Sequence, residues 1–303
     1  MATTTYPKFN ENTEALDVAG AFASEIRGKT IMVTGVNRGG TGLSTTQAFE
    51  FPKVNYRGLQ VDFPNLESVR NAAYEIMSWA DVPTINIVIN SAGIMGIQER
   101  TLSQDGIELH CATNHLGHWL LTCLIMPKLI KAAESNPTGA TRVVNVSSAS
   151  VQASGMRWSD MNFERRNKDL PAEEEPNYES LYVPLDGYNR SKGANVLFGI
   201  AANKRLFDKH GMLTLSLHPG VIDTELGRNM SLKDLEAFAD LVAALDPKLA
   251  QGVGKSKNGS ENWGSYLDSC QISGKAHPLA ISSEEAEKLW DVSERLVGQT
   301  FAW

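Results

Sequence analysis

The sequence predicts an α/β fold, a doubly wound parallel sheet in a single domain, and three observations lead to it. Short β-branched runs alternate with longer stretches that carry apolar residues at three-to-four spacing, which is typical of βαβ units. The 303 residues, 42% of them hydrophobic and 21% charged, provide material for one sizeable core. No repeat divides the chain.

The predicted elements alternate along the chain between short strands and longer helices. Two stretches rich in turn-forming residues, 167–177 and 252–265, predict exposed loops. The predicted strands cover residues 29–34, 54–62, 84–90, 141–147 and 214–218. The predicted helices cover residues 44–49, 66–79, 106–133, 188–210, 232–245 and 284–297, and a helical extension precedes the first strand.

The charge and cysteine content exclude several classes of function. Lys and Arg number 28 against 35 Asp and Glu, and no basic cluster breaks this acidic balance, so we expect no nucleic-acid partner. The three cysteines, Cys111, Cys123 and Cys270, are too far apart for a disulfide framework or a CxxC zinc site, so we expect no metal and a reducing compartment. Since no run of about 18 apolar residues occurs, we expect no membrane span and a cytoplasmic location.

A glycine-rich turn follows the first predicted strand and leads into a helix. It contains Gly35, Gly40 and Gly42 before Leu43, and such glycines let backbone N–H groups approach a pyrophosphate at a helix N-terminus. A Walker P-loop is excluded because no Gly-Lys-Ser/Thr follows. Arg38 within the turn favours NADP over NAD, because a guanidinium pairs well with a 2′-phosphate; a solvated loop arginine is the alternative.

Candidate reactive groups occur at two places farther along the chain. Tyr188 and Lys192 are four residues apart in a helical pattern, which puts them on one helix face. A phenol near pKa 10 transfers protons poorly at neutral pH, and a neighbouring ammonium helps to lower that pKa. Ser148 follows a predicted strand, at the sheet edge where α/β proteins bind ligands, and its hydroxyl is able to hydrogen-bond a substrate carbonyl.

Together these patterns resemble the short-chain dehydrogenase/reductase family, nearest to its retinol-dehydrogenase-like, fungal-type members, over about residues 12–300. The resemblance implies a Rossmann-like fold and NAD(P)-dependent interconversion of an alcohol and a ketone or aldehyde. The motifs that carry it are the TGxxxGxG-like turn at 35–42, Asn90-Ser91-Ala92-Gly93, Asn114 in Thr113-Asn114-His115-Leu116-Gly117, Ser148, Tyr188 with Lys192, and Pro219-Gly220 leading to Thr224.

The resemblance also implies a role for each matching residue. Tyr188 resembles the proton donor and acceptor, Lys192 the residue that lowers its pKa and holds the nicotinamide ribose, and Ser148 the group that orients the reacting oxygen. Asn114 is similar to the asparagine that holds a proton-relay water. The implied cofactor contacts are Asn90, Ala92 and Gly93 on the adenosine-ribose side, Asp62 facing the adenine, and Val221 and Thr224 at the nicotinamide carboxamide.

The sequence departs from the family pattern directly after the glycine turn. Only residues 43–53 separate Gly42 from Val54, which leaves room for one helix, so a strand and a helix of the family are predicted to be missing. Residues 54–62 then either keep the family's third-strand position, which predicts weak cofactor preference, or move beside the first strand. In the second case Asp62 binds a ribose 2′-OH and favours NAD. A lost exon or a mispredicted gene model is our hypothesis for the gap.

A long insertion before Tyr188 bears on the substrate. It contains Trp158, Met161, Phe163 and Tyr182, which favours a bulky apolar substrate, with an outer loop packing on the core as the alternative. We expect a cofactor half at about 28–150, a substrate loop at 151–187 and a lid at 221–303.

The hypotheses for function belong to different classes. The leading one is an NAD(P)-dependent oxidoreductase acting on a small-molecule substrate, with secondary metabolism as its setting. A catalytically weak or inactive Rossmann-derived binding protein is the alternative that the missing unit motivates. A nucleotide-sugar epimerase or dehydratase fits the glycine spacing poorly. The substrate, the direction of the reaction and whether the chain forms a homo-oligomer stay open.

Overall fold

A six-stranded sheet forms the centre of the computed structural model, which describes residues 4–49, 55–174, 181–220, 226, 239–257 and 260–303. Its order is β1-β2-β3-β4-β5-β6, and all pairs are parallel except the last. This confirms the predicted α/β class with a parallel sheet. The strands are β1 (Ile31–Val33), β2 (Ile87–Asn90), β3 (Arg142–Val146), β4 (Leu213–His218), β5 (Tyr266–Asp268) and β6 (Gln271–Ile272).

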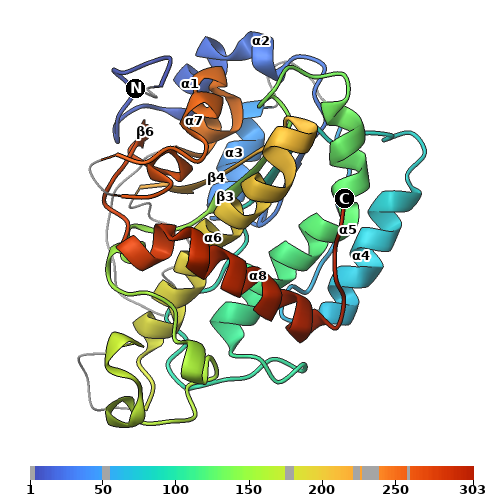
Figure 1. The fold of residues 1–303 in the computed structure, drawn as a ribbon. Helices are drawn as coiled ribbons and strands as arrows, with labels where there is room; N and C mark the ends of the chain where they lie inside the picture. Colours follow the sequence, from blue (N-terminus) through green and yellow to red (C-terminus); the bar gives the residue numbers. More distant parts are fainter. Residues whose placement is uncertain (1–3, 50–54, 175–180, 221–225, 227–238, 258–259) are drawn as a thin grey trace.

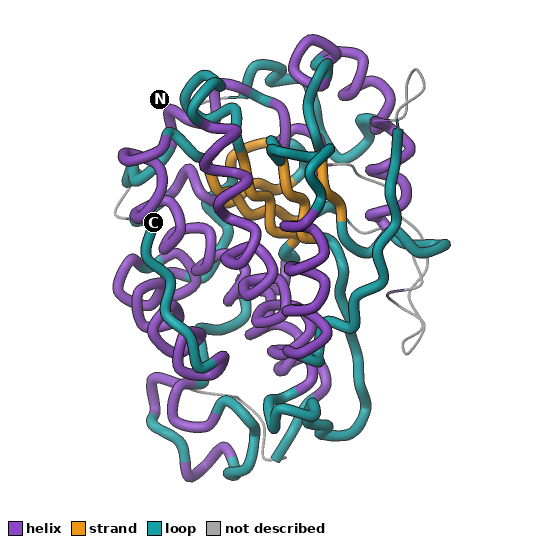
Figure 2. The backbone as a smooth tube through the Cα atoms, turned by 90° about the vertical axis from the view of Figure 1, so that its right-hand side faces the viewer, coloured by secondary structure: helices purple, strands orange, loops and turns teal. Residues whose placement is uncertain are grey.

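Helices cover both faces of the sheet, as the ribbon and the backbone tube show (Figure 1, Figure 2). One face carries α4, α5 and α6, with α8 packed on α6, and the other carries α1, α3 and α7. The helices are α1 (Ala15–Ala21), α2 (Ala23–Ile26), α3 (Thr41–Phe49), α4 (Leu66–Ser78), α5 (Gly117–Ala133), α6 (Pro184–His210), α7 (Ala239–Leu245) and α8 (Ser283–Val297).

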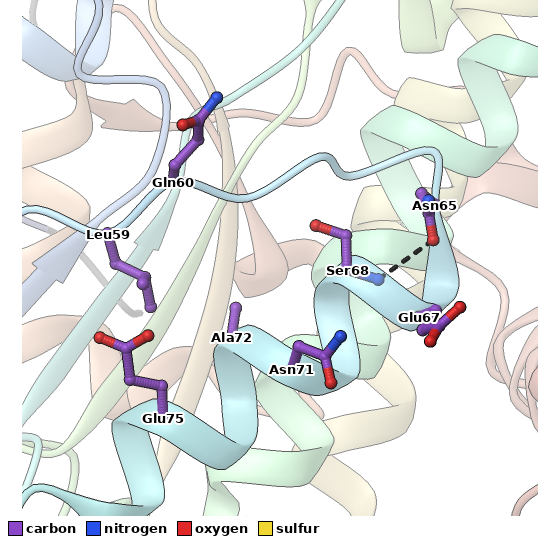
Figure 3. A pocket seen from close by; sticks show the side chains of 8 residues that line it. All are labelled: Leu59, Gln60, Asn65, Glu67, Ser68, Asn71, Ala72 and Glu75. Atoms are coloured by element: carbon purple, nitrogen blue, oxygen red, sulfur yellow. Dashed lines mark hydrogen bonds between the residues drawn. The ribbon is translucent and has the colours of Figure 1, made fainter.

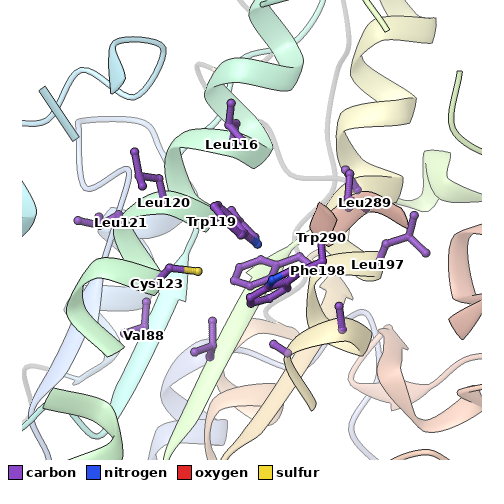
Figure 4. Close-up of a cluster of buried hydrophobic side chains, with 14 of the residues drawn as sticks. Val88, Leu116, Trp119, Leu120, Leu121, Cys123, Leu197, Phe198, Leu289 and Trp290 are labelled. Atoms are coloured by element: carbon purple, nitrogen blue, oxygen red, sulfur yellow. The ribbon is translucent and has the colours of Figure 1, made fainter. Parts of the chain in front are cut away.

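The larger core lies between the sheet and the helices α4, α5, α6 and α8. Trp119 of α5 and Trp290 of α8 meet edge to face at 5.2 Å between ring centres, and Phe198 of α6 lies beside them (Figure 4). Trp119 is completely buried. Aromatic groups in such edge-on contacts contribute beyond their buried area, so α8 is an integral part of this core.

The sequence explains where the long helix α6, which carries the candidate tyrosine, begins and ends. It begins at Pro184, earlier than the predicted residue 188, because proline suits the first turn of a helix. It ends at His210, and the next residue, Gly211, caps it with a left-handed φ of 67°, which suits glycine. Eighteen of its residues are buried in one continuous element, which fixes the direction of the side chains that it presents.

The predicted strand at 54–62 is wrong for residues 55–62, which form no strand. Arg57 lies over the ring of Trp79 at 4.6 Å and pairs with Asp81, so this segment is held at the end of α4. Within the described residues, β1 pairs with β2 alone. Residues 55–62 therefore form a strand neither in the family's third-strand position nor beside β1.

Other differences lie at element boundaries. The predicted helix at 106–133 is divided into a π-helix, Cys111–Leu116, and α5. The predicted helix at 232–245 is described only from residue 239. Strands β5 and β6, which the sequence analysis did not predict, extend the sheet within the region expected to form the lid. None of the helices in the described ranges has the length and apolar character that a membrane crossing needs.

Candidate active site

A cavity of about 530 Å³ opens at the carboxyl edge of the parallel strands β1 to β4. Open α/β sheets bind their ligands at this edge. The cavity joins the glycine turn at one end to the candidate reactive groups at the other. The described residues that line it include Gly35, Asn37, Gly40, Thr41, Asp62, Phe63, Ser91, Ala92, Gly93, Thr113, Ser148, Tyr188, Lys192, His218 and Gly220.

The glycine turn approaches neighbouring backbone too closely for any side chain. A Cβ on Gly35, whose φ is 74°, would lie 2.8 Å from the Cα of Ala92. A Cβ on Gly40 would lie 2.9 Å from the carbonyl oxygen of Gly35, and one on Gly42 would meet the carbonyl of Thr34. At these three positions the turn before α3 therefore has no room for a side chain. This is the tight form in which backbone N–H groups approach a pyrophosphate, so the residues present fit a dinucleotide.

A threonine hydroxyl connects this turn to the next strand. Thr34 Oγ1 accepts hydrogen bonds from the amides of Ser91 and Ala92, each at 2.9 Å. It lies 2.9 Å from Nε2 of His118, and since its oxygen already accepts two protons, we assign its own proton to that nitrogen. Phe63 stacks on the His118 ring at 4.1 Å. Three segments are thus connected beneath the nucleotide end of the cavity.

Some of the predicted cofactor residues line this cavity and others do not. Asp62 is exposed and lines it, as do Ala92 and Gly93. Arg38 is exposed on the turn, and neither Arg38 nor Leu43 is among the lining residues. Asn90 is buried, and its amide nitrogen donates to Asn145 at 2.9 Å. Val221 and Thr224 lie outside the described residues.

Ser148, Tyr188 and Lys192 come together at the other end of the cavity. Tyr188 and Lys192 lie on one face of α6, with Lys192 Nζ 5.7 Å from the centre of the Tyr188 ring. Lys192 Nζ donates to the carbonyl of Val146 at 2.9 Å, which holds it at the end of β3. The hydroxyls of Ser148 and Tyr188 and the ammonium of Lys192 thus lie around the same part of the cavity.

The protonation of Tyr188 is governed by its burial. Burial raises its pKa to about 12, and a hydrogen bond with the Ser148 side chain acts in the opposite direction. A buried phenol of this kind keeps its proton at neutral pH, so it is suited to donate that proton to an acceptor in the cavity.

Asn114 lies in the π-helix and connects three segments around the site. Its Nδ2 donates to Ser191 Oγ at 2.9 Å and to the carbonyl of Ile94 at 3.0 Å. Its Oδ1 accepts from the amide of Ile94 at 2.8 Å. Asn114 is 1% exposed and does not line the cavity, whereas its neighbour Thr113 does. In this structure Asn114 therefore fastens the loop after β2 to α6.

The described aromatic rings of the insertion before Tyr188 do not line the cavity. Trp158 donates to Glu285 of α8, and Phe163 packs edge-on against Tyr182 at 5.4 Å. None of the four residues singled out in this insertion is among the lining residues. Apolar lining comes from elsewhere, namely from Ile94, Met95, Ile97, Leu109 and Leu226.

A second cavity, of about 320 Å³, runs along the exposed side of α4 (Figure 3). Its walls are mainly polar, with Gln60 on one side and Glu67, Asn71 and Glu75 on the helix. None of the candidate reactive residues lines it. In the described parts of the chain, no group of three His, Cys, Asp or Glu side chains is placed to hold a metal.

Several residues of the site went unnoticed in the sequence. Thr34, Phe63 and His118 adjoin motif residues, but nothing in their spacing signals that they contact one another. Tyr266 donates a hydrogen bond to the carbonyl of Ser148 at 3.0 Å although 118 residues separate them. No local pattern predicts a contact of that range.

Comparison with known proteins finds relatives among oxidoreductases. No family model matches the chain. It is 33% identical to Oxidoreductase fscI of Fusarium equiseti over 70% of this chain and 94% of that one. It is 32% identical to the chloroplastic short-chain dehydrogenase TIC 32 A of Brassica napus, over 82% of this chain and 74% of that one. Human retinol dehydrogenase 12 is 32% identical over 79% of this chain and 69% of its own.

Solved structures share the fold. An uncharacterised protein from Mycobacterium paratuberculosis superposes with a TM-score of 0.59 and 25% identity, over 96% of this chain and 92% of that one. A short-chain dehydrogenase from Burkholderia cenocepacia in complex with NADP gives a TM-score of 0.50 at 19% identity, over 80% and 89% of the two chains. The chain therefore belongs to the short-chain dehydrogenase/reductase family and is an NAD(P)-dependent oxidoreductase.

Proposed function

We propose that the protein interconverts an alcohol and a ketone or aldehyde on a fairly bulky apolar substrate, with NADP preferred over NAD. The observation that carries this proposal is the single cavity that holds Ser148, Tyr188 and Lys192 at one end and the glycine turn at the other. The two ends correspond to the two reactants that such a reaction brings together, a substrate and a dinucleotide.

The proposed chemistry rests on what the chain's own residues do around the carbonyl oxygen. A bound nicotinamide supplies or accepts the hydride at the carbonyl carbon. In the reducing direction, Tyr188 Oη donates its proton to the carbonyl oxygen, and Ser148 Oγ hydrogen-bonds the same oxygen and orients it. In the oxidising direction, Tyr188 accepts the alcohol proton, and the Lys192 ammonium favours the phenolate that forms.

The remaining predicted residues hold this arrangement. Asn114 acts by keeping the Ile94 loop against α6, since its amide bonds to both. Ala92 and Gly93 form the wall of the cavity beside the glycine turn, where the nucleotide binds in the proposal. Val221 and Thr224 keep their assignment to the nicotinamide carboxamide from the family resemblance alone.

The proposed substrate class follows from the lining of the cavity. Ile94, Met95, Ile97, Leu109 and Leu226 are apolar, and the charged side chains of the described lining are Asp62 and Lys192. Apolar walls bind apolar groups by removing them from water. Similarity to a fungal oxidoreductase supports the proposed setting in secondary metabolism.

The preference for NADP rests on Arg38, which lies exposed at the glycine turn. A guanidinium there is able to pair with a 2′-phosphate, whereas the nearby Asp62 carboxylate repels one. Calorimetric titration with NADPH and NADH compares the two directly, and we expect NADPH to bind more tightly. Tighter binding of NADH would overturn the preference and leave the reaction class intact.

The reaction itself is tested by following NADPH oxidation with a panel of aromatic ketones and lipid aldehydes. Tyr188→Phe should lower kcat at least about a hundredfold, because it removes the proton that general acid catalysis needs. Tyr6→Phe is the matched control, since the Tyr6 hydroxyl donates to the carbonyl of Ala21, away from the cavity. Equal rates for Tyr188→Phe and the native protein would remove the proposed role.

A further inference from the structure

A buried tyrosine outside the family motifs contacts the backbone of the candidate serine. Tyr266 opens strand β5, is 1% exposed, and pairs with Ser216 of β4 in the sheet. Its hydroxyl donates to the carbonyl oxygen of Ser148 at 3.0 Å. The rigid strand pairing therefore determines where this donor lies, and the donor in turn determines where the serine carbonyl lies.

The same C-terminal region holds the loop after Ser148 at further points. The amide of His277 donates to the carbonyl of Val151 at 3.0 Å. Gly155 packs so closely on Leu279 that a Cβ there would lie 2.7 Å from Leu279 Cδ1. The loop that begins at the serine is thus attached to residues 266–279 near its start, in its middle and at its end.

Two other contacts attach this stretch to α6, namely the hydrogen bond between the Ser148 and Tyr188 side chains and the bond from Ser147 Oγ to the carbonyl of Lys192 at 2.7 Å. Bonds that attach it to the sheet are fewer. The last sheet bond on this strand is donated by the Ser147 amide to the carbonyl of Leu217 at 2.7 Å. Beyond it, the Ser148 carbonyl accepts a 3.3 Å bond from the Val151 amide within its own turn. The Ser148 hydroxyl oxygen accepts from the amide of Ser150 at 3.2 Å. Since both of these bonds are local, they shape the turn but do not attach it to the sheet.

We propose that Tyr266 is a positioning residue for the reaction, acting through Ser148. The inference rests on the proposed function, in which the Ser148 hydroxyl orients the reacting oxygen. The Tyr266 hydroxyl anchors the serine backbone to the sheet, so that the Ser148 hydroxyl stays within reach of Tyr188 and of the carbonyl oxygen. Misplacement of a reacting group by a fraction of an ångström is costly, because orientation supplies a large share of catalysis.

The decisive variant is Tyr266→Phe, which keeps the buried ring and removes only the hydroxyl. We expect kcat to fall about tenfold, with the KM values for cofactor and substrate within about twofold of the native values. Tyr6→Phe, which also removes a hydroxyl that donates to a backbone carbonyl, should leave kcat unchanged. A kcat for Tyr266→Phe equal to the native value would overturn the proposal.

A double-mutant cycle separates positioning from a general loss of structure. In a Ser148→Ala background the serine hydroxyl is already absent, so adding Tyr266→Phe should cost less than about twofold in kcat. A tenfold loss in both backgrounds would mean that Tyr266 acts by another route, and the proposal would fail. If Tyr266→Phe does not fold, Leu279→Ala loosens the same loop at a partly exposed position and enters the same cycle.

Hydrogen exchange distinguishes failure of this inference from failure of the proposed function. In the native protein without ligands, Tyr266→Phe should speed amide exchange in the peptide that contains residues 148–155, whereas Tyr6→Phe should not. This readout does not require turnover. If the native protein shows no oxidoreductase activity, the proposed function fails, and unchanged exchange in this peptide would overturn the anchoring by Tyr266 as well.

Discussion

Two strands that lead into the cavity, β3 and β1, differ in how firmly their neighbours hold them. Strand β3 lies between β2 and β4, and all of its residues are buried. Strand β1 pairs with β2 alone in the described residues, and its residues are only partly buried. The reactive side chains lie near the end of β3, and the glycine turn follows β1. The comparison teaches that the structure holds the reaction centre more firmly than the nucleotide end.

The largest effect that we expect in a test of this comparison is the loss of folding stability at acidic pH. His115 and His118 lie on the π-helix and α5, and burial lowers the pKa of each to about 3. Unfolded histidine titrates near 6.5, so the stabilisation is complete above pH 6.5 and is lost as the pH falls toward 3. Lowering the pH from 6.5 to 5 should cost roughly 2 kcal/mol for each histidine.

Urea unfolding at pH 5 and pH 7 measures this loss, with His115→Gln and His118→Gln as comparisons. His115 contacts Ser293 of α8 at 2.9 Å, whereas His118 contacts Thr34 beside β1. If the protein unfolds as one unit, both variants should reduce by the same amount the difference in the free energy of unfolding between pH 7 and pH 5. A change confined to His118→Gln would show that the nucleotide end opens separately, and no change in either would contradict the assignment of neutral, buried rings.

A matched pair of truncations compares the two strands directly. Val144 of β3 is completely buried, and Val33 of β1 is partly buried against the same hydrophobic cluster. Val144→Ala should lower the free energy of unfolding by about 2–3 kcal/mol and Val33→Ala by about 1 kcal/mol, because the cost scales with the apolar contact removed. Chemical denaturation gives both values. Equal losses would show that β1 is packed as firmly as β3.

The smallest expected effect concerns the exposed arginine of the glycine turn. Arg38→Ala should weaken NADPH binding by about tenfold, or about 1.4 kcal/mol, and leave NADH binding within twofold, since only NADPH carries the 2′-phosphate. Calorimetry measures both affinities, and the preserved NADH affinity is the internal control. Weakening of both cofactors by the same factor would place Arg38 in the support of the turn rather than in the choice of cofactor.

The sequence predicted the elements whose side-chain pattern is local. Strands β1 to β4 follow β-branched or apolar runs, and the spacing of Tyr188 and Lys192 correctly placed them on one helix face. The short run at 54–62 predicted a strand as well, but Arg57 attaches this segment to Trp79 instead. Pattern alone does not reveal which partner a half-apolar segment meets, because tertiary contacts override propensity.

The structure brings the predicted reactive residues Ser148, Tyr188 and Lys192 to one cavity, whereas several contacts around them were not predicted. The motif spacing located Ser148 and the glycine turn, whereas Tyr266 was missed because it lies in a three-residue strand after a loop rich in glycine and serine. The rings of Trp158, Phe163 and Tyr182 suggested a lining of the cavity, but none of the three lines it. A sequence pattern carries no information on which way a loop side chain points. The functions assigned to individual residues, and the missing strand and helix, stay predictions.

The aromatic packing between α5 and α8 has a practical consequence for optical experiments. Trp119 and Trp290 are buried against each other, whereas no tryptophan is among the described residues that line the 530 Å³ cavity. Trp79, Trp158 and Trp303 pack against the same larger core. Intrinsic fluorescence will therefore report mainly on the larger core, and loosening of the turn before α3 will change it little. A tryptophan introduced at Phe63, which lines that cavity, would make the nucleotide end visible to the same measurement.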